Sequence, residues 1–139
     1  MKPKEILALT VGILFFIIDQ TTKFIAVQEG SAQLNTGVAL SVQLGPALPI
    51  ILAIFFFGFM YWLWRSRSAT VTTFVFGFAV FSNLVDRVHY GGVVDWLKVP
   101  GSVVINNLAD WAIVLCLGWW FLCRVKKGAR ADIEKRNNG

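Results

Sequence analysis

Residues 70–90 read TVTTFVFGFAVFSNLVDRVHY. The stretch is apolar over most of its length, and a helix needs around 20 such residues to cross about 30 Å of hydrocarbon. Near its end, four polar side chains fall at the i, i+3, i+4 and i+7 positions of one helix face: Asn83, Asp86, Arg87 and Tyr90. The stretch therefore predicts a membrane-crossing helix with one polar stripe.

The composition of the whole chain is that of a membrane protein. Of its 139 residues, 56% are hydrophobic and 15% are charged, against roughly 45–50% and about 25% in soluble domains. A soluble domain of this size needs more polar residues to cover its surface. A disordered chain carries fewer aromatic residues than these six Trp and twelve Phe, and two cysteines are too few for a disulfide scaffold. We expect an all-α membrane protein with a single domain, residues 1–139.

Three further apolar stretches complete the predicted fold. We expect four transmembrane helices at about residues 6–27, 46–64, 70–90 and 107–124. Ten of the thirteen Lys and Arg residues flank these helices on one side, whereas the outer segments 28–45 and 91–106 hold only Lys98. This positive-inside pattern places both termini in the cytoplasm, with a polar, frayed or disordered tail at about 126–139. Bases spread over three membrane-flanking segments do not form the basic face of a nucleic-acid-binding protein.

Four of the eight acidic residues lie inside or at the outer ends of the apolar stretches: Asp19, Asp86, Asp95 and Asp110. A carboxylate in a membrane helix costs about 2.5–3.5 kcal/mol on insertion scales, so such residues usually have a role. Asp19 and Lys23 are four residues apart with the acid first, which favours a structural ion pair on one helix face. Arg87 can hold a carboxylate or a backbone carbonyl through its five donors. We expect the polar stripe of Asn83, Asp86, Arg87 and Tyr90 to form a buried orienting network near the outer membrane surface.

Asp95 and Asp110 have no cation close to them in the sequence except Lys98. The segment between them leaves and returns on one side of the membrane, so both carboxyl groups should lie at the outer surface. Two carboxyl groups brought together do not both ionise readily, so one of them holds a proton at neutral pH. Such a pair can activate water with one group and protonate the scissile amide with the other. The alternative is that Asp110 caps the N-terminus of its helix.

The outer segment between the first two helices alternates with period two. Its even positions from Leu34 to Leu44 are mostly apolar, and its odd positions, which include Asn35, Gly37 and Ala39, are small or polar. This pattern predicts a small β element at about 33–44 with its apolar face toward the membrane. The other face would be open to an extended peptide, which adds to a strand by backbone hydrogen bonds. The alternative is a surface hairpin without a ligand.

Four short motifs resemble those of the lipoprotein signal peptidase family, signal peptidase II. They are Asp19-Gln20-Thr21-Thr22-Lys23, similar to D-Q-x-x-K; Asn35-Thr36-Gly37-Val38-Ala39, similar to N-x-G-x-A; Asn83-Leu84-Val85-Asp86-Arg87 followed by Val93-Val94-Asp95, similar to N-x-x-D-R and V-V-D; and Asn107-Leu108-Ala109-Asp110, similar to N-x-A-D. Each motif is weak alone. Four in the same order and topology are specific, and they span most of the chain.

The resemblance implies an intramembrane aspartyl protease of the bacterial cytoplasmic membrane, with its active site at the outer face and Asp95 and Asp110 as its catalytic dyad. It gives supporting or substrate-contacting roles to Asp19, Lys23, Asn35, Gly37, Ala39, Asn83, Asp86, Arg87, Asn107 and Ala109. The family's substrates are prolipoproteins with a diacylglyceryl group on the lipobox cysteine, and cleavage falls on the amino side of that cysteine. Besides these substrates and membrane lipids we expect no nucleic-acid partner, and we expect a monomer. No metal or cofactor is needed, since the dyad itself activates the water.

The chain departs from the family pattern in several places. Ser82 stands where Gly is usual, and Trp111 stands where a small residue is common. The outer segments 24–34 and 96–109 are shorter than those the family usually has. We therefore expect a reduced cradle and lid over the site.

Two other functions fit parts of the pattern. A small proton-coupled transporter would carry a proton on a carboxylate near the bilayer midplane, but the candidate, Asp19, lies in the outer part of its helix beside Lys23. A non-catalytic paralogue would keep the fold and hold lipidated peptides without cutting them. Both Asp95 and Asp110 are present, which favours the enzyme.

Overall fold

The computed structural model describes residues 2–37, 48–66, 70–101 and 104–137. Four helices dominate it: α1 (Pro3–Gln28), α2 (Leu48–Ser66), α3 (Val71–Tyr90) and α4 (Leu108–Asn137). The predicted mainly helical fold with four helices is confirmed, and the first three helices begin and end within three residues of their predicted limits.

The end of α4 differs from the prediction. The helix continues to Asn137 instead of ending near residue 124 in a frayed or disordered polar tail. The segment after residue 124 is rich in Arg, Lys and Ala, which have high helix propensity. Its polarity suggested an irregular end, but polarity does not prevent a helix from continuing into water.

Within the described part of the chain, three helices are long and apolar enough to cross a membrane: Pro3–Gln28, Val71–Tyr90 and Leu108–Arg130. Large apolar side chains such as Leu115 on α4 and Phe55 on α2 are exposed, as expected where lipid surrounds a protein. The chain is therefore a membrane protein. α2 is a 19-residue helix but is not among the three spans found in the described residues, so a fourth crossing stays a prediction.

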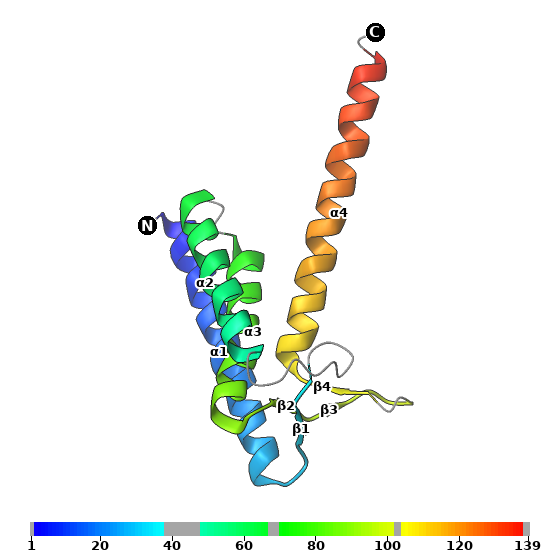
Figure 1. Cartoon of the computed structure of the whole chain (residues 1–139). Helices are drawn as coiled ribbons and strands as arrows, with labels where there is room; N and C mark the ends of the chain where they lie inside the picture. Colours follow the sequence, from blue (N-terminus) through cyan, green and yellow to red (C-terminus); the bar gives the residue numbers. More distant parts are fainter. Residues whose placement is uncertain (1, 38–47, 67–69, 102–103, 138–139) are drawn as a thin grey trace.

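Figure 1 shows both chain termini at one end of the helices and all the strands at the other end. Successive helices run in opposite directions between these two ends. The arrangement agrees with a chain that crosses the membrane an even number of times. That the strands lie at the outer membrane surface remains a prediction from the charge pattern.

Helix α3 is the element against which the other three helices pack. Small residues allow close approach: a Cβ on Gly12 of α1 would lie 2.5 Å from the Phe78 ring, and one on Gly77 would lie 2.7 Å from Met60 of α2. Close backbone contact through small residues is a common way for membrane helices to associate. Toward α4 the core is a cluster of small side chains with three larger neighbours: Ala79, Ala109 and Ala112, packed by Phe15, Val75 and Ile113.

Four short strands form two antiparallel pairs at the end of the bundle opposite the termini. β1 (Gln33–Asn35) pairs with β2 (Val93–Asp95), and β3 (Leu97–Lys98) pairs with β4 (Ile105–Asn106). Trp96, between β2 and β3, donates its backbone N–H to Asn106 across 3.0 Å. β2 and β3 are thus consecutive in the chain; β1 pairs with β2, and β4 pairs with β3. We call the pair of β1 and β2 the ribbon.

The predicted strand at about 33–44 is confirmed only at its start. β1 ends at Asn35, the next two residues are not in a strand, and positions 38–44, including Ala39, lie outside the described residues. β2, β3 and β4 were not predicted, because strands of two or three residues are too short to show an alternating pattern. The three residues of β2 are all buried, so their burial does not alternate along the strand even in the structure.

Two glycines connect α3 to the ribbon. Gly91 ends the helix with φ = 76°, in the left-handed conformation that favours glycine. Gly92 lies against β1: a Cβ there would be 2.9 Å from the Asn35 carbonyl oxygen and 2.9 Å from the Leu34 side chain. The close approach of α3's end to β1 therefore depends on the absence of a side chain at position 92.

We expect Gly92→Ala to displace β1 from β2 while the helices stay folded. The added methyl group would contact the Asn35 backbone, which cannot rotate away as a side chain can. Hydrogen exchange should become faster at the amides of residues 33–35 and 93–95, with unchanged helical circular dichroism. Gly118→Ala is the matched control, since a Cβ at that position meets nothing within 4 Å. Equal exchange in the two variants would contradict this role of Gly92.

Candidate active site

A buried ammonium group joins α1 to α3. Lys23 Nζ lies 2.8 Å from Asp19 Oδ2, 2.7 Å from Asp86 Oδ2 and 2.8 Å from Asn83 Oδ1. Both carboxylates are fully buried, and Lys23 is 2% exposed. The three contacts match the three donors of an ammonium group. The predicted ion pair between Asp19 and Lys23 is therefore present, and it includes a second carboxylate from α3 that the local spacing did not indicate.

Asp86 connects this ion cluster to the ribbon. Its Oδ2 also accepts the backbone N–H of Val94 in β2 at 3.1 Å, and its Oδ1 accepts from Gln20 Nε2 at 2.9 Å. Val94 immediately precedes Asp95 in the chain. The side chain of Asp86 thus positions the strand residue next to one of the two predicted catalytic groups.

Asp19 makes the corresponding connection to α4. Its Oδ1 accepts the backbone N–H of Ala109 at 3.0 Å, and its Oδ2 accepts the hydroxyl of Ser82 at 2.6 Å. Ala109 is in the first turn of α4, where backbone N–H groups lack helical partners and a negative charge is favourable. The residue after Ala109 is Asp110, so a carboxylate from α1 holds the turn that carries the second predicted catalytic group.

Asp95 and Asp110 are brought together by one amide group. Asn107 Nδ2 donates to Asp95 Oδ1 at 2.6 Å and lies 3.3 Å from Asp110 Oδ2. The two carboxylate oxygens therefore cannot be farther apart than these two distances together. The other oxygens accept from two more amides, Asn35 to Asp95 Oδ2 at 3.0 Å and Asn83 to Asp110 Oδ1 at 2.8 Å.

The local cap of α4 is Asn107 and not Asp110. The side-chain Oδ1 of Asn107 accepts the backbone N–H of Asp110 at 2.9 Å, which is the usual bond from an N-cap residue to the third residue of a helix. The alternative role considered for Asp110 is thus performed by another residue. Its carboxylate instead faces the amides of Asn83 and Asn107.

Burial raises the pKa of the Asp95 carboxyl above its usual value, and this is the largest influence on it. The hydrogen bonds from Asn35 and Asn107 act in the opposite direction, as does the charge of Lys23, because each stabilises the ionised form. A carboxyl group with a raised pKa retains a proton more readily. This is the condition under which one member of a carboxyl pair can act as an acid.

Arg87 holds the chain beyond β1. Its Nη2 donates to the backbone carbonyl of Gly37 at 2.6 Å, and the N–H of Gly37 donates to Asn35 Oδ1 at 3.0 Å. Of the two partners considered for Arg87, the structure shows the backbone carbonyl. Asp86 and Arg87 are therefore not each other's partners: the acid pairs with Lys23.

Most of the predicted site residues lie together in one hydrogen-bonded network. Tyr90, the last member of the polar stripe, is 38% exposed and lies outside the network. Trp111, which follows Asp110, is 41% exposed. Gln20 and Ser82 were not predicted as members. Gln20 Nε2 contacts both Ser82 Oγ, at 2.7 Å, and Asp86. The available signal was the helical spacing of Ser82 and Asp86, four residues apart on α3.

Comparisons with known proteins identify a matching family and a similar fold. Residues 11–126 match a family model described as signal peptidase (SPase) II. Two solved structures have a similar fold, each described as a bacterial membrane enzyme determined by the in meso method, at 2.3 Å and 1.9 Å resolution. The first is 19% identical, with a TM-score of 0.78 over 89% of this chain and 90% of its own. The second is also 19% identical, with a TM-score of 0.70 over 86% and 93%. No curated protein sequence matches the chain.

We expect Lys23→Met to destabilise the fold strongly, because it leaves two buried carboxylates without a cation. Removing one partner of a buried ion pair typically costs about 3–5 kcal/mol. The free energy of unfolding, measured by denaturant titration in mixed micelles, should fall by an amount of this size. Lys98→Met, at an exposed position in β3, should leave it almost unchanged. Similar stabilities of the two variants would show that the cluster does not stabilise the fold.

Proposed function

Because the chain belongs to the signal peptidase II family, we propose that it is an aspartic endopeptidase of the bacterial cytoplasmic membrane. It removes signal peptides from diacylglyceryl-modified prolipoproteins and cuts on the amino side of the lipobox cysteine. The observation that carries the proposal is the amide of Asn107, which contacts the carboxylates of both Asp95 and Asp110. Two carboxyl groups held this close can share one proton and supply an acid and a base together.

The reaction needs only these two groups and a water molecule. The ionised carboxylate takes a proton from water as the water oxygen bonds to the carbonyl carbon of the scissile peptide. The protonated carboxyl then gives its proton to the leaving nitrogen as the C–N bond breaks. The products are a new carboxyl end on the signal peptide and a free amino group on the lipid-modified cysteine. The proton taken from water restores the shared proton of the pair.

The supporting residues divide into two groups by what they contact. Asp19, Lys23, Asn83, Asp86 and Asn107 bind the carboxylates or the elements that carry them. Ala109 is fully buried and donates its backbone N–H to Asp19. We assign to this group the task of holding the dyad in place before substrate arrives.

The second group would position the substrate. Asn35, Gly37 and, in the proposal, Ala39 follow one another along the chain that starts with β1, and Arg87 fixes the Gly37 carbonyl. The substrate is extended at its cleavage site, and an extended peptide can add to a strand by backbone hydrogen bonds. The Nε of Arg87 is buried and has no hydrogen-bond partner among the described residues. It is a donor available for a carbonyl oxygen of such a peptide.

The location of the dyad suits a lipid-anchored substrate. Asp95 lies just beyond the end of α3, and Asp110 lies in the first turn of α4, so both are at the boundary of the membrane-crossing segments. A substrate with acyl chains that stay in the bilayer presents its cysteine at this depth. A transporter would instead need a free carboxylate near the bilayer midplane, and the carboxylate of Asp19 is occupied by Lys23, Ser82 and Ala109.

We expect Asp95→Asn and Asp110→Asn each to abolish cleavage of a diacylglyceryl-modified prolipoprotein peptide. General acid–base groups typically contribute about 10²–10⁴-fold in rate, and a dyad acts as a unit, so the loss should be at least of this size. Cleavage before the cysteine is followed by mass spectrometry, with a non-lipidated peptide alongside. Glu29→Gln changes an exposed acid at the end of α1 and should retain full rate.

Three outcomes distinguish the candidates. Full activity in either Asp variant would exclude the dyad. Binding of the lipidated peptide by the unaltered protein without cleavage would identify a non-catalytic paralogue. Cleavage that needs both carboxyl groups and the lipid would establish the proposed activity.

We further expect Asn35→Leu to move the pH profile of the reaction to higher pH. The amide of Asn35 donates to Asp95 and stabilises its ionised form, so removing the donor raises the pKa of Asp95 further. A hydrogen bond to a charged group is worth about 1.5–3 kcal/mol, so a displacement of about one to two pH units is expected. The limb of the kcat/KM profile that reports Asp95 should move by this amount.

Gln33→Leu is the matched control for this measurement. Gln33 lies two residues earlier on the same strand and is exposed, so its replacement removes an amide from the same face of β1. Its pH profile should coincide with that of the unaltered protein. A shift to lower pH in Asn35→Leu, or equal shifts in the two variants, would contradict the assigned role of Asn35.

A further inference from the structure

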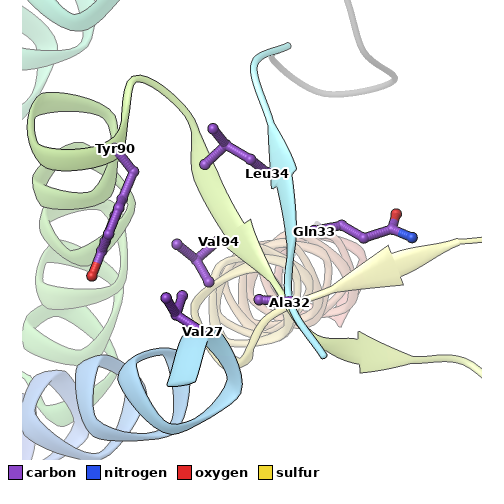
Figure 2. A pocket seen from close by; sticks show the side chains of 6 residues that line it. All are labelled: Val27, Ala32, Gln33, Leu34, Tyr90 and Val94. Atoms are coloured by element: carbon purple, nitrogen blue, oxygen red, sulfur yellow. The ribbon is translucent and has the colours of Figure 1, made fainter. Parts of the chain in front are cut away.

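The ribbon has a hollow on one side. The hollow measures about 230 Å³ and is lined by Val27, Ala32, Gln33, Leu34, Tyr90 and Val94. Figure 2 shows it between the last turn of α1, the end of α3 and the two strands. The side chains of Leu34 and Val94 point into it from the strands, and the ring of Tyr90 lies on its far side. The hollow is thus bounded by α1, α3 and both strands of the ribbon.

The hollow lies on the face of the ribbon opposite the one that carries the side chains of Asn35 and Asp95. Asn35 and Asp95 are the strand neighbours of Leu34 and Val94, and successive side chains of a strand point to opposite faces. In the antiparallel register Leu34 is paired with Val94, so these two side chains share one face. The side chain of Gln33 points away from the hollow in Figure 2. The hollow is therefore separate from the candidate active site.

The chemistry of the lining is that of a site for hydrocarbon. Four of the lining side chains are aliphatic, and Tyr90 contributes an aromatic ring with one hydroxyl. None of the six lining residues is charged, and the amide of Gln33 points away from the hollow. An apolar hollow of this size favours an apolar occupant, since water in it would lose hydrogen bonds.

The lipid-facing surface of the protein continues into the hollow. Ile13, Ile17, Phe24 and Val27 are all exposed, and their spacing of four, seven and three residues places them on one face of α1. This face belongs to a membrane span that ends at Gln28, and Tyr90 is the last residue of another span. Val27 belongs both to this exposed apolar face and to the lining of the hollow, so the hollow adjoins the helix surface that would face bilayer hydrocarbon. Tyrosine is also a residue typical of the boundary between membrane and water.

We propose that this hollow binds one acyl chain of a bilayer phospholipid, at a site distinct from the one that binds substrate. The acyl chain packs against Leu34 and Val94 on this face of the ribbon, which we call its back face. The amides and carboxylates hold the ribbon on the opposite face, its front face. The site takes a hydrocarbon chain and leaves the headgroup at the membrane surface near Tyr90. It does not depend on proteolytic activity, so a failure of the proposed function would leave it unchanged.

Photocrosslinking with the full chain in lipid nanodiscs tests this directly. The nanodiscs contain phosphatidylethanolamine and phosphatidylglycerol with a trace of phosphatidylcholine that carries a diazirine on its acyl chain or, in a parallel sample, on its headgroup. After irradiation, adducts are mapped by mass spectrometry. The chain probe should label Leu34, Val94 or Tyr90, and the headgroup probe should not label Val94. Val94 is only 2% exposed, so its labelling requires a chain inside the hollow.

Filling the hollow provides the second measurement. Val27→Trp and, separately, Ala32→Trp should cause loss of the adducts on Leu34 and Val94 while those on Ile17 persist. Val114→Trp, which enlarges an exposed side chain on α4, is the matched control and should retain all of them. Absence of adducts on the hollow residues in the unaltered protein would overturn the proposal. So would adducts on Leu34 and Val94 that persist in both filling variants, or equal labelling of Val94 by the headgroup probe.

Discussion

The buried ammonium of Lys23 is the constraint on which the rest of the structure depends. Taking a charge out of water costs several kcal/mol, and the cost is recovered only where partners are placed with good geometry. Lys23 therefore needs Asp19, Asp86 and Asn83 at hydrogen-bonding distance at the same time. Since two of these partners are on α3, the requirement sets the rotation and the height of α1 against α3. The small residues at the same helix contact allow that approach but do not select one register.

Each amide around the two carboxylates is oriented by a nearby donor, and for Asn83 that donor is Lys23. An asparagine side chain can be turned over with little change of shape, so a nearby donor must decide which end points where. Lys23 donates to the Oδ1 of Asn83, the N–H of Gly37 donates to that of Asn35, and the N–H of Asp110 donates to that of Asn107. Each amide must then direct its NH₂ group toward a carboxylate. The NH₂ groups on the front face of the ribbon and at the start of α4 therefore already point toward the carboxylates of Asp95 and Asp110 before any substrate is present.

The parts of the fold and site that could be predicted are those with a local signal. The four helices follow from apolar length, and the pair of Asp19 with Lys23 follows from a spacing of four residues. The meeting of Asp95 with Asp110 was reasoned from membrane topology and from motifs. What could not be predicted depends on long-range geometry: nothing local indicates that Asp86 takes Lys23 rather than Arg87 as its partner, or that Ser82 binds Asp19. Strands as short as β3 and β4 are determined by the elements they join and show no pattern of their own.

The ribbon shows why such long-range contacts are needed. Two strands of three residues are far below the size at which a sheet is stable alone, so its place must be set by contacts outside its own ladder. On one edge, Asp86 accepts the N–H of Val94. On the front face, the amides of Asn35 and Asn107 bind Asp95. On the back face, Leu34 and Val94 meet the apolar hollow. Hydrogen bonds hold the ribbon at its edge and on its front face. On the back face the two side chains are aliphatic and form no hydrogen bonds, so the ribbon is held there by packing of apolar groups. In a protein surrounded by hydrocarbon, the lipid itself is the available material for that packing.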